Sequence, residues 1–396
     1  MKIVRVEAIP LRAEPQEIYW GARTWSADRG ATLSGYPPQQ RRRYVYSETI
    51  DTCLVRVETS DGVIGWGESK APVAPEVAAE IVNQLLAPVA LGSSLTDIAV
   101  TWERMYAGMR VRGHASGFWL EALAGVDIAL WDAWARTLGQ PVHVLLGGAF
   151  RTDVPVYASG IPARRIAADP SAAEAIRTEA DRLVAAGWTA IKVAIGIDPE
   201  ADLDSVRIVS EALGANGTVF ADAAGAYDVR QALHVGRGLE ELGVGFFEMP
   251  VPPENIDGYR SLAARLDIPL ALDSLATRAQ SLEFLRAGAL HILQPDVCRA
   301  GGITETMRIA ALADSFGAIA TPHISIGSAV HFAASLQCAA AIPNLQIMEH
   351  WIGTNPLAAV AADLDVPTGS VRRVPTTPGL GIEVDEAVVV SLRSHR

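Results

Sequence analysis

Short apolar runs that each end in an acidic residue or a histidine recur along the C-terminal two-thirds of the chain. The residues that end them are spaced 23 to 27 positions apart: Asp222, Glu248, Asp273, Asp296, His323 and Glu349. A strand of about 5–6 residues and a helix of about 11–12, with their connections, fill such an interval. The pattern therefore predicts a repeated strand–helix unit with a polar side chain at the end of each strand.

The alternation of strand and helix patterns extends from residue 141 to residue 353. We expect strands at residues 154–158, 190–196, 218–223, 244–250, 268–274, 291–297, 319–324 and 346–351. Glycine adopts the left-handed conformation that ends helices, and five of the predicted helices end at one: Gly187, Gly214, Gly243, Gly288 and Gly317. Eight strands that alternate with helices favour a closed parallel barrel. The predicted fold class is α/β, with a (β/α)8 TIM-type barrel over residues 141–353.

Residues 1–140 have a pattern typical of a separate α+β domain. Residues 3–9 alternate like a strand, and residues 49–69 resemble a hairpin that turns at Ser60-Asp61-Gly62. Helical patterns follow at residues 77–86, 99–109 and 119–138. Residues 354–396 are rich in proline and glycine and end in a strand-like segment at 384–392. We expect this tail to return to the N-terminal domain and to form a capping domain with it.

A polar and aromatic segment, about residues 19–46, separates the first predicted strand from the hairpin. A loop of this length in a compact domain is usually functional or mobile, so we interpret it as a lid. Its tryptophans are candidates for excluding water, and its arginines for binding a distal carboxylate: Trp20, Trp25, Arg41, Arg42 and Arg43. The alternatives are interface or core aromatics and a solvated charge cluster. Lys70, after the hairpin, is expected at the surface, with substrate contact as the alternative.

Composition and charge narrow the class of protein. The net charge of −12 argues against a nucleic-acid partner, which would need a basic face. No segment offers the roughly 20 uninterrupted apolar residues of a membrane span, and the N-terminus carries too much charge for a signal peptide. The three cysteines, Cys53, Cys298 and Cys338, match no metal or redox spacing. They are predicted to be buried thiols, so we expect a cytoplasmic protein.

The order of the six strand-end residues indicates their chemistry. Three successive carboxylates, Asp222, Glu248 and Asp273, favour a hard divalent cation with oxygen ligands. Asp296 and His323 then suggest a base with a partner, because imidazole has a pKa of about 6.5 and can be neutral at pH 7. A strand-end Asp or Glu is often only a helix N-cap, but six in register are much harder to explain in that way.

The chain resembles the enolase superfamily, mandelate racemase subgroup, over essentially its whole length. The motifs that carry the resemblance are GVIGWGES, GVDIALWDAWARTLGQPVHVLLGG, AIKVAIG, VFAD, FFEMPVPPEN, LQPDVCRAGGITE, TPH, IMEHW and PGLGIEV. The sixth strand ends in Asp296 and is followed by His323, whereas the muconate-lactonizing and succinylbenzoate-synthase branches have a lysine there. Within the subgroup, the chain is most similar to sugar-acid enzymes of the galactarolactone cycloisomerase and dehydratase kind.

The resemblance implies a role for each strand-end residue. Asp222, Glu248 and Asp273 match the Mg²⁺ ligands, Asp296 and His323 match the catalytic dyad, and Glu349 matches a carboxylate that hydrogen-bonds the substrate. A protonated Glu349 would donate such a bond to the enediolate. Lys192 matches the first lysine of the Lys-x-Lys motif. The implied reaction removes the proton next to a carboxylate of a small-molecule sugar acid or lactone, with Mg²⁺ and Lys192 offsetting the charge. Homologous barrels often form homo-oligomers, and we expect one here.

Departures from the family pattern leave alternatives open. Ala194 replaces the second lysine, and residues two apart on a strand face the same side, so a base for the opposite face of the substrate is missing. One-base chemistry remains, either β-elimination of water or lactone cycloisomerisation with His323 as base. Met249 and the run at residues 223–226 make the substrate shell apolar. The alternatives are a racemase-type isomerase or one with Lys192 as base, and a non-catalytic relative that binds Mg²⁺ and a carboxylate.

Other polar positions have weaker patterns. The helix that begins at Gly327 and Ser328, after His323, is a candidate anion site because helix N-termini attract anions. His331 lies in that helix with no partner pattern and is expected to be structural. His350, next to Glu349, should point out of the barrel toward the helices.

Overall fold

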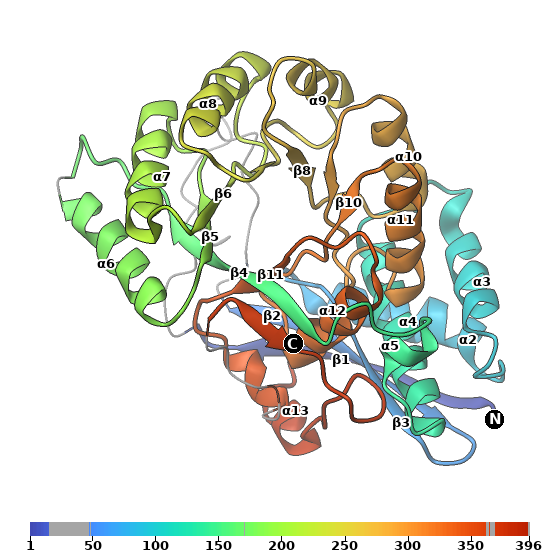
Figure 1. The fold of residues 1–396 in the computed structure, drawn as a ribbon. Helices are drawn as coiled ribbons and strands as arrows, with labels where there is room; N and C mark the ends of the chain where they lie inside the picture. Colours follow the sequence, from blue (N-terminus) through green and yellow to red (C-terminus); the bar gives the residue numbers. More distant parts are fainter. Residues whose placement is uncertain (16–46, 48, 170, 362–363, 365–368, 395–396) are drawn as a thin grey trace, which may run out of the picture.

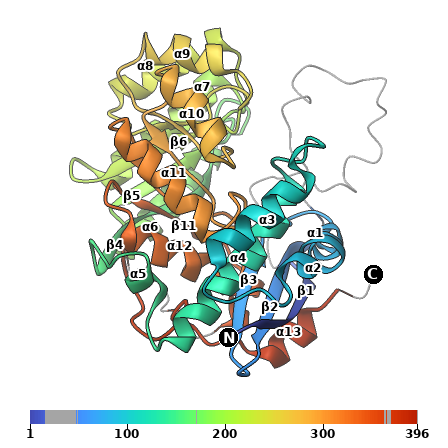
Figure 2. The same ribbon diagram turned by 90° about the vertical axis from the view of Figure 1, so that its right-hand side faces the viewer.

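The computed structural model describes residues 1–15, 47, 49–169, 171–361, 364 and 369–394. A ring of parallel strands surrounded by helices lies beside a smaller domain with an antiparallel sheet (Figures 1 and 2). The predicted lid, with Trp20, Trp25 and Arg41 to Arg43, lies outside the described residues.

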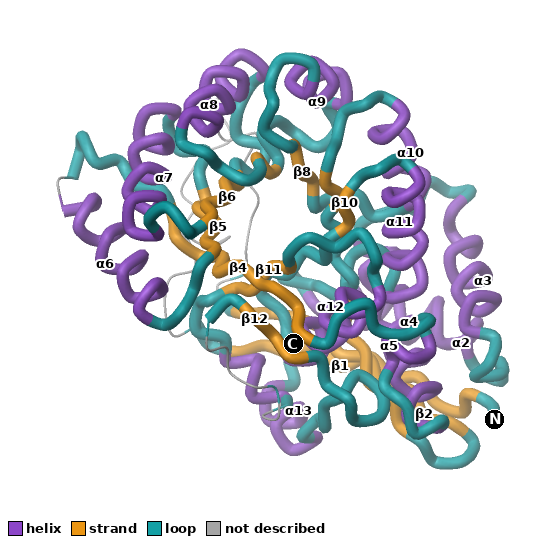
Figure 3. The backbone as a smooth tube through the Cα atoms, viewed as in Figure 1, coloured by secondary structure: helices purple, strands orange, loops and turns teal. Residues whose placement is uncertain are grey.

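The ring consists of eight parallel strands that pair in chain order, except that the last strand pairs with the first (Figure 3). The strands are β4 (Asp153–Pro162), β5 (Ala190–Ala194), β6 (Thr218–Asp222), β7 (Phe247–Glu248), β8 (Leu270–Leu272), β9 (Ile292–Leu293), β10 (Ile319–Ala320) and β11 (Met348–Trp351). Between β10 and β11, the Ala320 N–H donates to the Asn344 carbonyl at 3.3 Å, and the Thr321 hydroxyl donates to the Ile347 carbonyl. The eight predicted strands are confirmed, although most are shorter than the apolar runs that predicted them.

Helices on the outside of the ring connect consecutive strands. They are α6 (Ser171–Ala185), α7 (Pro199–Leu213), α8 (Val229–Glu241), α9 (Ile256–Ala263), α10 (Arg278–Arg286), α11 (Ile303–Ser315) and α12 (Ala329–Ala341). The five glycines predicted to end helices all have φ between 60° and 86°. After β11 the chain forms the 3-10 helix η4 (Pro356–Val360) and then β12 (Val371–Arg373), which pairs antiparallel with β4.

An aromatic cluster fills the barrel interior below the strand ends. Tyr157, Phe220 and Phe246 are buried, and the rings of Phe220 and Phe246 stack with centroids 4.2 Å apart. The side chain of Lys192 lies above them, with its Nζ 5.5 Å from the centroid of the Tyr157 ring. Because this floor is packed with aromatic side chains, polar chemistry is confined to the rim where the strands end.

The smaller domain is a three-stranded antiparallel sheet with helices on one side. Its strands are β1 (Ile3–Ala13), β2 (Ile50–Thr59) and β3 (Ile64–Ser69), and its helical segments are α1 (Pro75–Ile81), the π-helix η3 (Val82–Leu86), α2 (Ala87–Ala90), α3 (Ile98–Arg110) and α4 (Phe118–Thr137). A short helix, α5 (Val142–Leu145), leads to the barrel. In β3, a Cβ on Gly65 or Gly67 would lie 2.2 Å or 2.0 Å from backbone oxygens of α4. Glycines are therefore required for this helix to lie directly on the sheet.

Two buried aspartates on α4 join the small domain to the rest of the chain. Asp127 accepts hydrogen bonds from the backbone N–H (2.9 Å) and hydroxyl (2.6 Å) of Thr304, at the start of α11. Asp132 accepts from the backbone N–H groups of Trp66 (2.9 Å) and Leu380 (2.8 Å). The acidic residues of the GVDIALWD motif thus hold barrel, hairpin and C-terminal segment together.

The expected strand at residues 384–392 is wrong, because the segment forms helix α13 (Glu386–Leu392). The Asp385 carboxylate accepts from the N–H groups of Ala387 (2.8 Å) and Val388 (3.3 Å). This N-cap outweighs the weak strand preference of the valines. After the helix, the Ser394 N–H donates to the Pro10 carbonyl of β1 at 2.8 Å.

Among the described residues, no helix combines the length and apolar character that a bilayer crossing requires.

Candidate active site

Lys192, on β5, lies at the centre of the charged side chains in the barrel mouth. Its Nζ is 2.8 Å from Glu248 Oε2, 2.8 Å from Glu349 Oε1 and 3.7 Å from Asp222 Oδ2, and its side chain is 1% exposed. Burial by itself would lower the pKa of Lys192, but the carboxylates of Glu248 and Glu349 raise it well above its usual value. Lys192 is therefore a protonated cation that binds carboxylates.

Two of the three predicted metal ligands, Asp222 and Glu248, pair with this cation, and the third, Asp273, lies beside Glu248. Glu248 and Asp273 place oxygens within 4.8 Å of each other and of a His323 ring nitrogen. Asp222 lies outside this close group, and its Oδ1 accepts from the Ala224 N–H at 2.8 Å. The Gln294 amide donates to Glu248 Oε2 at 2.9 Å.

The electrostatics of these carboxylates favour a bound cation. Burial raises the pKa of both Glu248 and Asp222, and the neighbouring carboxylates raise it as well. Lys192 acts in the opposite direction, but the net pKa of both groups stays raised. In addition, Asp273 Oδ1 is buried and accepts no hydrogen bond from the described part of the chain. A hard divalent cation takes oxygen ligands of this kind and would stabilise their ionised forms. The donor set therefore fits such an ion.

His323 lies between the carboxylate cluster and Asp296. Its Nδ1 is 3.0 Å from Asp296 Oδ2, and its Nε2 is 3.5 Å from both Asp273 Oδ2 and Glu349 Oε2. Burial by itself would raise the pKa of Asp296. Lys70 and His331 act in the opposite direction and prevail, so the pKa is well below its usual value. An ionised Asp296 can only accept a hydrogen bond, which places the proton on Nδ1 and leaves Nε2 toward the site.

Glu349 is held as an anion. It accepts from the Ile324 N–H at 2.9 Å and pairs with Lys192. Burial by itself would raise its pKa, but Lys192 and His323 act in the opposite direction and bring it down to about 2. An ionised Glu349 accepts hydrogen bonds, and the donor role toward an enediolate that the sequence suggested stays a prediction for the substrate complex.

Two residues that the sequence analysis expected to lie at the surface or to be structural contact Asp296. Lys70 was expected at the surface, but it is buried: its side chain is 7% exposed and its Nζ lies 2.5 Å from Asp296 Oδ2. His331 is buried, with its Nε2 3.1 Å from Asp296 Oδ1. Lys70 lies 226 residues from Asp296 in sequence, and no local pattern reports such a contact. For His331 a signal existed, because it follows the N-cap of the helix after the His323 strand and so had to lie near the rim.

The N-terminus of α12, predicted as an anion site, is bound by a carboxylate of the protein itself. Glu68 of β3, which is fully buried, accepts from the backbone N–H groups of Ser328 (2.8 Å) and His331 (2.9 Å). The Ser328 hydroxyl donates to it at 2.5 Å. The expectation of a ligand anion at this helix is therefore wrong, because the N–H groups are already satisfied.

Two of the departures from the family pattern, Ala224 and Met249, lie in tight turns after β6 and β7. Ala224 and Met249 have φ of 47° and 39°, a left-handed conformation that is uncommon for residues other than glycine. The Gly225 N–H donates to the Met249 carbonyl at 2.7 Å, which joins the loops after β6 and β7. Neither side chain offers a hydrogen-bonding group comparable to the polar residues common in the family.

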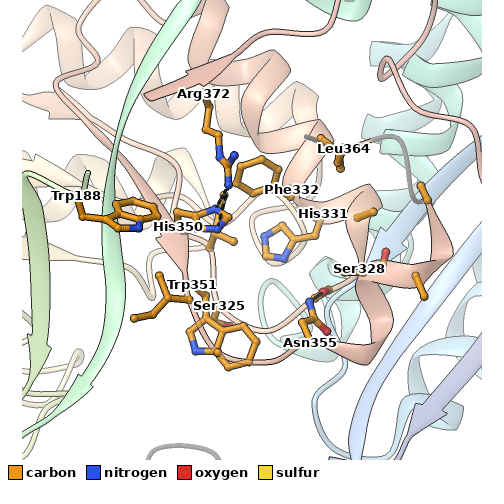
Figure 4. Close-up of a pocket in the computed structure, with 18 of the residues that line it drawn as sticks. Trp188, Ser325, Ser328, His331, Phe332, His350, Trp351, Asn355, Leu364 and Arg372 are labelled. Carbon is orange, nitrogen blue, oxygen red and sulfur yellow. Dashed lines mark hydrogen bonds between the residues drawn. The ribbon is translucent and has the colours of Figure 1, made fainter. Parts of the chain in front are cut away.

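A cavity of about 560 Å³ lies outside the ring, between α6, α12, β11 and η4. In the described part of the chain, β11 is followed by the short 3-10 helix η4, and the cavity lies beside both. His350 lies in it, as predicted from its outward direction, with the rings of Trp188 and Phe332 5.6 Å and 5.0 Å away (Figure 4). Arg372 Nη2 is 3.2 Å from His350 Nε2. His331 also lines the cavity, whereas His323 and the carboxylates of the barrel mouth do not.

Comparison with known proteins identifies the class of protein. Residues 43–147 match the family model described as mandelate racemase / muconate lactonizing enzyme, N-terminal domain. Residues 175–388 match the model described as enolase C-terminal domain-like. The chain therefore belongs to the mandelate racemase subgroup of the enolase superfamily, and its fold is the TIM barrel with a capping domain that the sequence predicted.

Similar proteins of known activity act on sugar acids. The chain is 35% identical to D-galactarolactone cycloisomerase of Agrobacterium fabrum, over 86% of this chain and 90% of that protein. It is 32% identical to arabinonate dehydratase of Saccharolobus solfataricus, with the same coverage. These relatives make the chain an enzyme of the lyase or isomerase class.

Solved structures agree over the full chain. The 3,6-anhydro-D-galactonate cycloisomerase from Zobellia galactanivorans superposes with a TM-score of 0.84 at 26% identity, covering 100% of both chains. A racemase from Streptomyces coelicolor with bound magnesium gives 0.83 at 26% identity, covering 99% of this chain and 100% of that one.

Proposed function

We propose that this protein removes the proton next to the carboxylate of a sugar acid or its lactone, with His323 as the base. The reaction then ends in β-elimination of water or in lactone cycloisomerisation. The observation that carries the proposal is the placement of His323, whose Nδ1 is 3.0 Å from Asp296 while Nε2 faces the carboxylate cluster. The dehydratase and cycloisomerase activities of the relatives support both outcomes.

Asp222, Glu248 and Asp273 are the residues that would hold a divalent cation, and the magnesium in the related racemase structure favours Mg²⁺. When bound, such a cation offsets the negative charge that develops on the substrate carboxylate. Lys192 adds a fixed positive charge on the same side, because it is held within 2.8 Å of both Glu248 and Glu349.

His323 acts alone on one face of the substrate. Its neutral ring donates a hydrogen bond from Nδ1–H to Asp296, keeps that proton, and uses the Nε2 lone pair to accept the proton from carbon. The resulting imidazolium, stabilised by Asp296, returns that proton to the departing hydroxyl, or to the carbon skeleton in a cycloisomerisation. Ala194 leaves no second base on β5, and the ion pairs of Lys192 hold it protonated, which argues against Lys192 as the base.

The test is solvent deuterium exchange, followed by NMR, over a library of mono- and diacid sugars and their lactones with Mg²⁺ present. Wild type should incorporate deuterium next to the carboxylate, and His323→Asn should abolish incorporation. His234→Asn, which changes an exposed histidine on α8, is the control and should behave as wild type. Exchange that persists in His323→Asn would refute His323 as base, and opposite stereochemistry would assign Lys192.

A non-catalytic relative is the second candidate, supported by the apolar residues Ala194, Ala224 and Met249. It predicts that Mg²⁺ and a sugar acid bind, as measured by isothermal titration, while no substrate in the library exchanges. The buried Asp296–His323 pair favours catalysis, because simple carboxylate binding does not require a base held in one tautomer.

A further inference from the structure

Surrounding groups contact both carboxylate oxygens of Asp296. Lys70 Nζ (2.5 Å) and His323 Nδ1 (3.0 Å) contact Oδ2. His331 Nε2 (3.1 Å) and the backbone N–H of Cys298 (2.9 Å) contact Oδ1. These four contacts fix the plane of the carboxylate, and with it the direction in which His323 is held.

Among the described residues, Lys70 is the lysine or arginine that contacts Asp296 directly, and it comes from the capping domain. Lys70 follows β3, and its backbone N–H donates to the Cys298 carbonyl at 3.2 Å, which docks the end of this strand on the loop after β9. Two residues earlier, Glu68 binds the N-terminus of α12. Lys70 therefore lies at the barrel rim on a strand end that is held by both the loop after β9 and the N-terminus of α12.

The choice of lysine at this position is informative. The chain has 33 Lys and Arg residues, of which only Lys2, Lys70 and Lys192 are lysines. Lys2 is exposed, whereas both others are buried against carboxylates of the barrel mouth. Lysine is a compact point charge, and arginine is a broad planar fork. A chain that uses arginine almost everywhere has lysine at the two buried positions beside the site.

We propose that Lys70 is a positioning residue for His323, acting through Asp296, so that the cap completes the catalytic dyad of the barrel. This inference rests on the proposed role of His323 as base. Without Lys70, Asp296 would keep two imidazoles and one backbone N–H beside it, and a buried carboxylate that loses an adjacent lysine takes a proton more readily. A protonated Asp296 can donate to Nδ1, which places the ring proton on Nε2 and removes the lone pair that accepts the substrate proton. Lys70 therefore supports the ionised carboxylate that orients the His323 ring.

The experiment measures the ring nitrogens of His323 directly, by ¹⁵N NMR of histidine-labelled protein at neutral pH. The signals of His323 are those lost in His323→Asn. We expect wild type to have Nδ1 protonated and Nε2 free, and Lys70→Met to lose that pattern in favour of a mixed or Nε2-protonated ring. Lys2→Met, which neutralises an exposed lysine, is the matched control and should keep the wild-type pattern.

Kinetics give the second measurement. In Lys70→Met we expect kcat for deuterium exchange to fall about 100-fold while KM changes by less than about threefold, because Lys70 acts behind the base. In an Asp296→Asn background the same substitution should cost little more, because the group through which it acts is gone. Lys70→Gln, which keeps a hydrogen-bond donor without the charge, replaces Lys70→Met if that variant does not fold.

The two proposals fail in different ways. If wild type exchanges no substrate, the proposed function fails, but the ring signals still test Lys70. If wild type exchanges and Lys70→Met keeps both its ring pattern and its kcat, the role of Lys70 is refuted. A Lys70→Met variant that loses activity with unchanged ring signals, and to the same extent with and without Asp296, would also refute it.

Discussion

His350 is a buried imidazole that the fold keeps neutral. Burial, and then the nearby Arg372 guanidinium, lower its pKa to about 3. An unfolded histidine has a pKa of about 6.5. Between these two values the unfolded chain binds a proton that the folded chain does not bind. The free energy of unfolding contributed by this residue is therefore complete above pH 6.5 and falls as the pH drops through the window, by at most about 1.4 kcal/mol per pH unit.

We predict that His350→Gln makes the protein less sensitive to acid. From pH 7 to pH 5, protonation of the unfolded His350 should cost wild type about 2 kcal/mol of stability, and the variant should not suffer this loss. Urea unfolding at the two pH values measures the difference. His234→Gln, at an exposed site on α8, is the control and should follow wild type. Equal acid sensitivity in all three proteins would show that the fold does not hold His350 neutral.

How much of the site could be predicted depends on the range of each contact. Asp222 and His323 could be identified because a residue type recurs at a fixed interval at the ends of strands. Lys70 could not be assigned, because its contact with Asp296 exists only after the hairpin has docked on the rim and its neighbours in sequence are compatible with a surface lysine. The N-cap before His331 places that histidine near the rim but does not identify Asp296 as the group it contacts.

At the level of elements, the junction between α4 and α11 depends on one glycine. Gly302, the N-cap of α11, has φ of 92°, and a Cβ there would lie 2.3 Å from Asp127 Oδ2. Asp127 is buried and holds the first turn of α11 through Thr304. A side chain at position 302 would therefore disturb both the backbone and the cap.

We predict that Gly302→Ala destabilises the protein more than Gly92→Ala. Gly92 also has a positive φ, 76°, but a Cβ there would meet no atom within 4 Å. Gly92→Ala should cost only the backbone strain, about 1–2 kcal/mol. Gly302→Ala should cost more, because it also displaces a buried carboxylate. Thermal unfolding midpoints of the two variants decide the matter, and equal shifts would mean that the Asp127 contact contributes nothing.

Elements were predictable where an apolar period and an end signal agreed. The barrel helices ended at their glycines, and the hairpin turned where Gly62, with φ of 81°, supplies the left-handed residue. The segment at residues 384–392 was misassigned because its valines favour a strand while the preceding Asp385 caps a helix. The cap prevailed because, among these residues, Val389 is buried and most of the others are exposed, so the sheet-forming character of the valines is not used.

For the whole molecule, the cation should be a stability factor as well as a catalytic one. Glu248, a buried carboxylate paired with Lys192, has its pKa raised mainly by burial. An ion that binds only the folded chain stabilises it by about 2.7 kcal/mol at 100 times its Kd. Binding would thus offset the cost of gathering carboxylates from several strands in one place.

We predict that saturating Mg²⁺ raises the thermal unfolding midpoint of wild type and that chelation reverses the increase. Glu248→Gln should lose most of the increase. Glu200→Gln, at an exposed site on α7, makes the same chemical change and should keep it, which separates site binding from a general effect of charge. The same increase in both variants would mean that Mg²⁺ binds elsewhere.

The end of β3 makes two separate contacts with the barrel, Glu68 with the first turn of α12 and Lys70 with Asp296. A chimera that joined this barrel to the cap of another superfamily member would therefore alter contacts within the barrel rim. It would replace the lysine that pairs with Asp296 and the glutamate that binds the first turn of α12. Recombination between such enzymes should give an active protein only when positions 68 and 70 are exchanged together with the barrel residues that they contact.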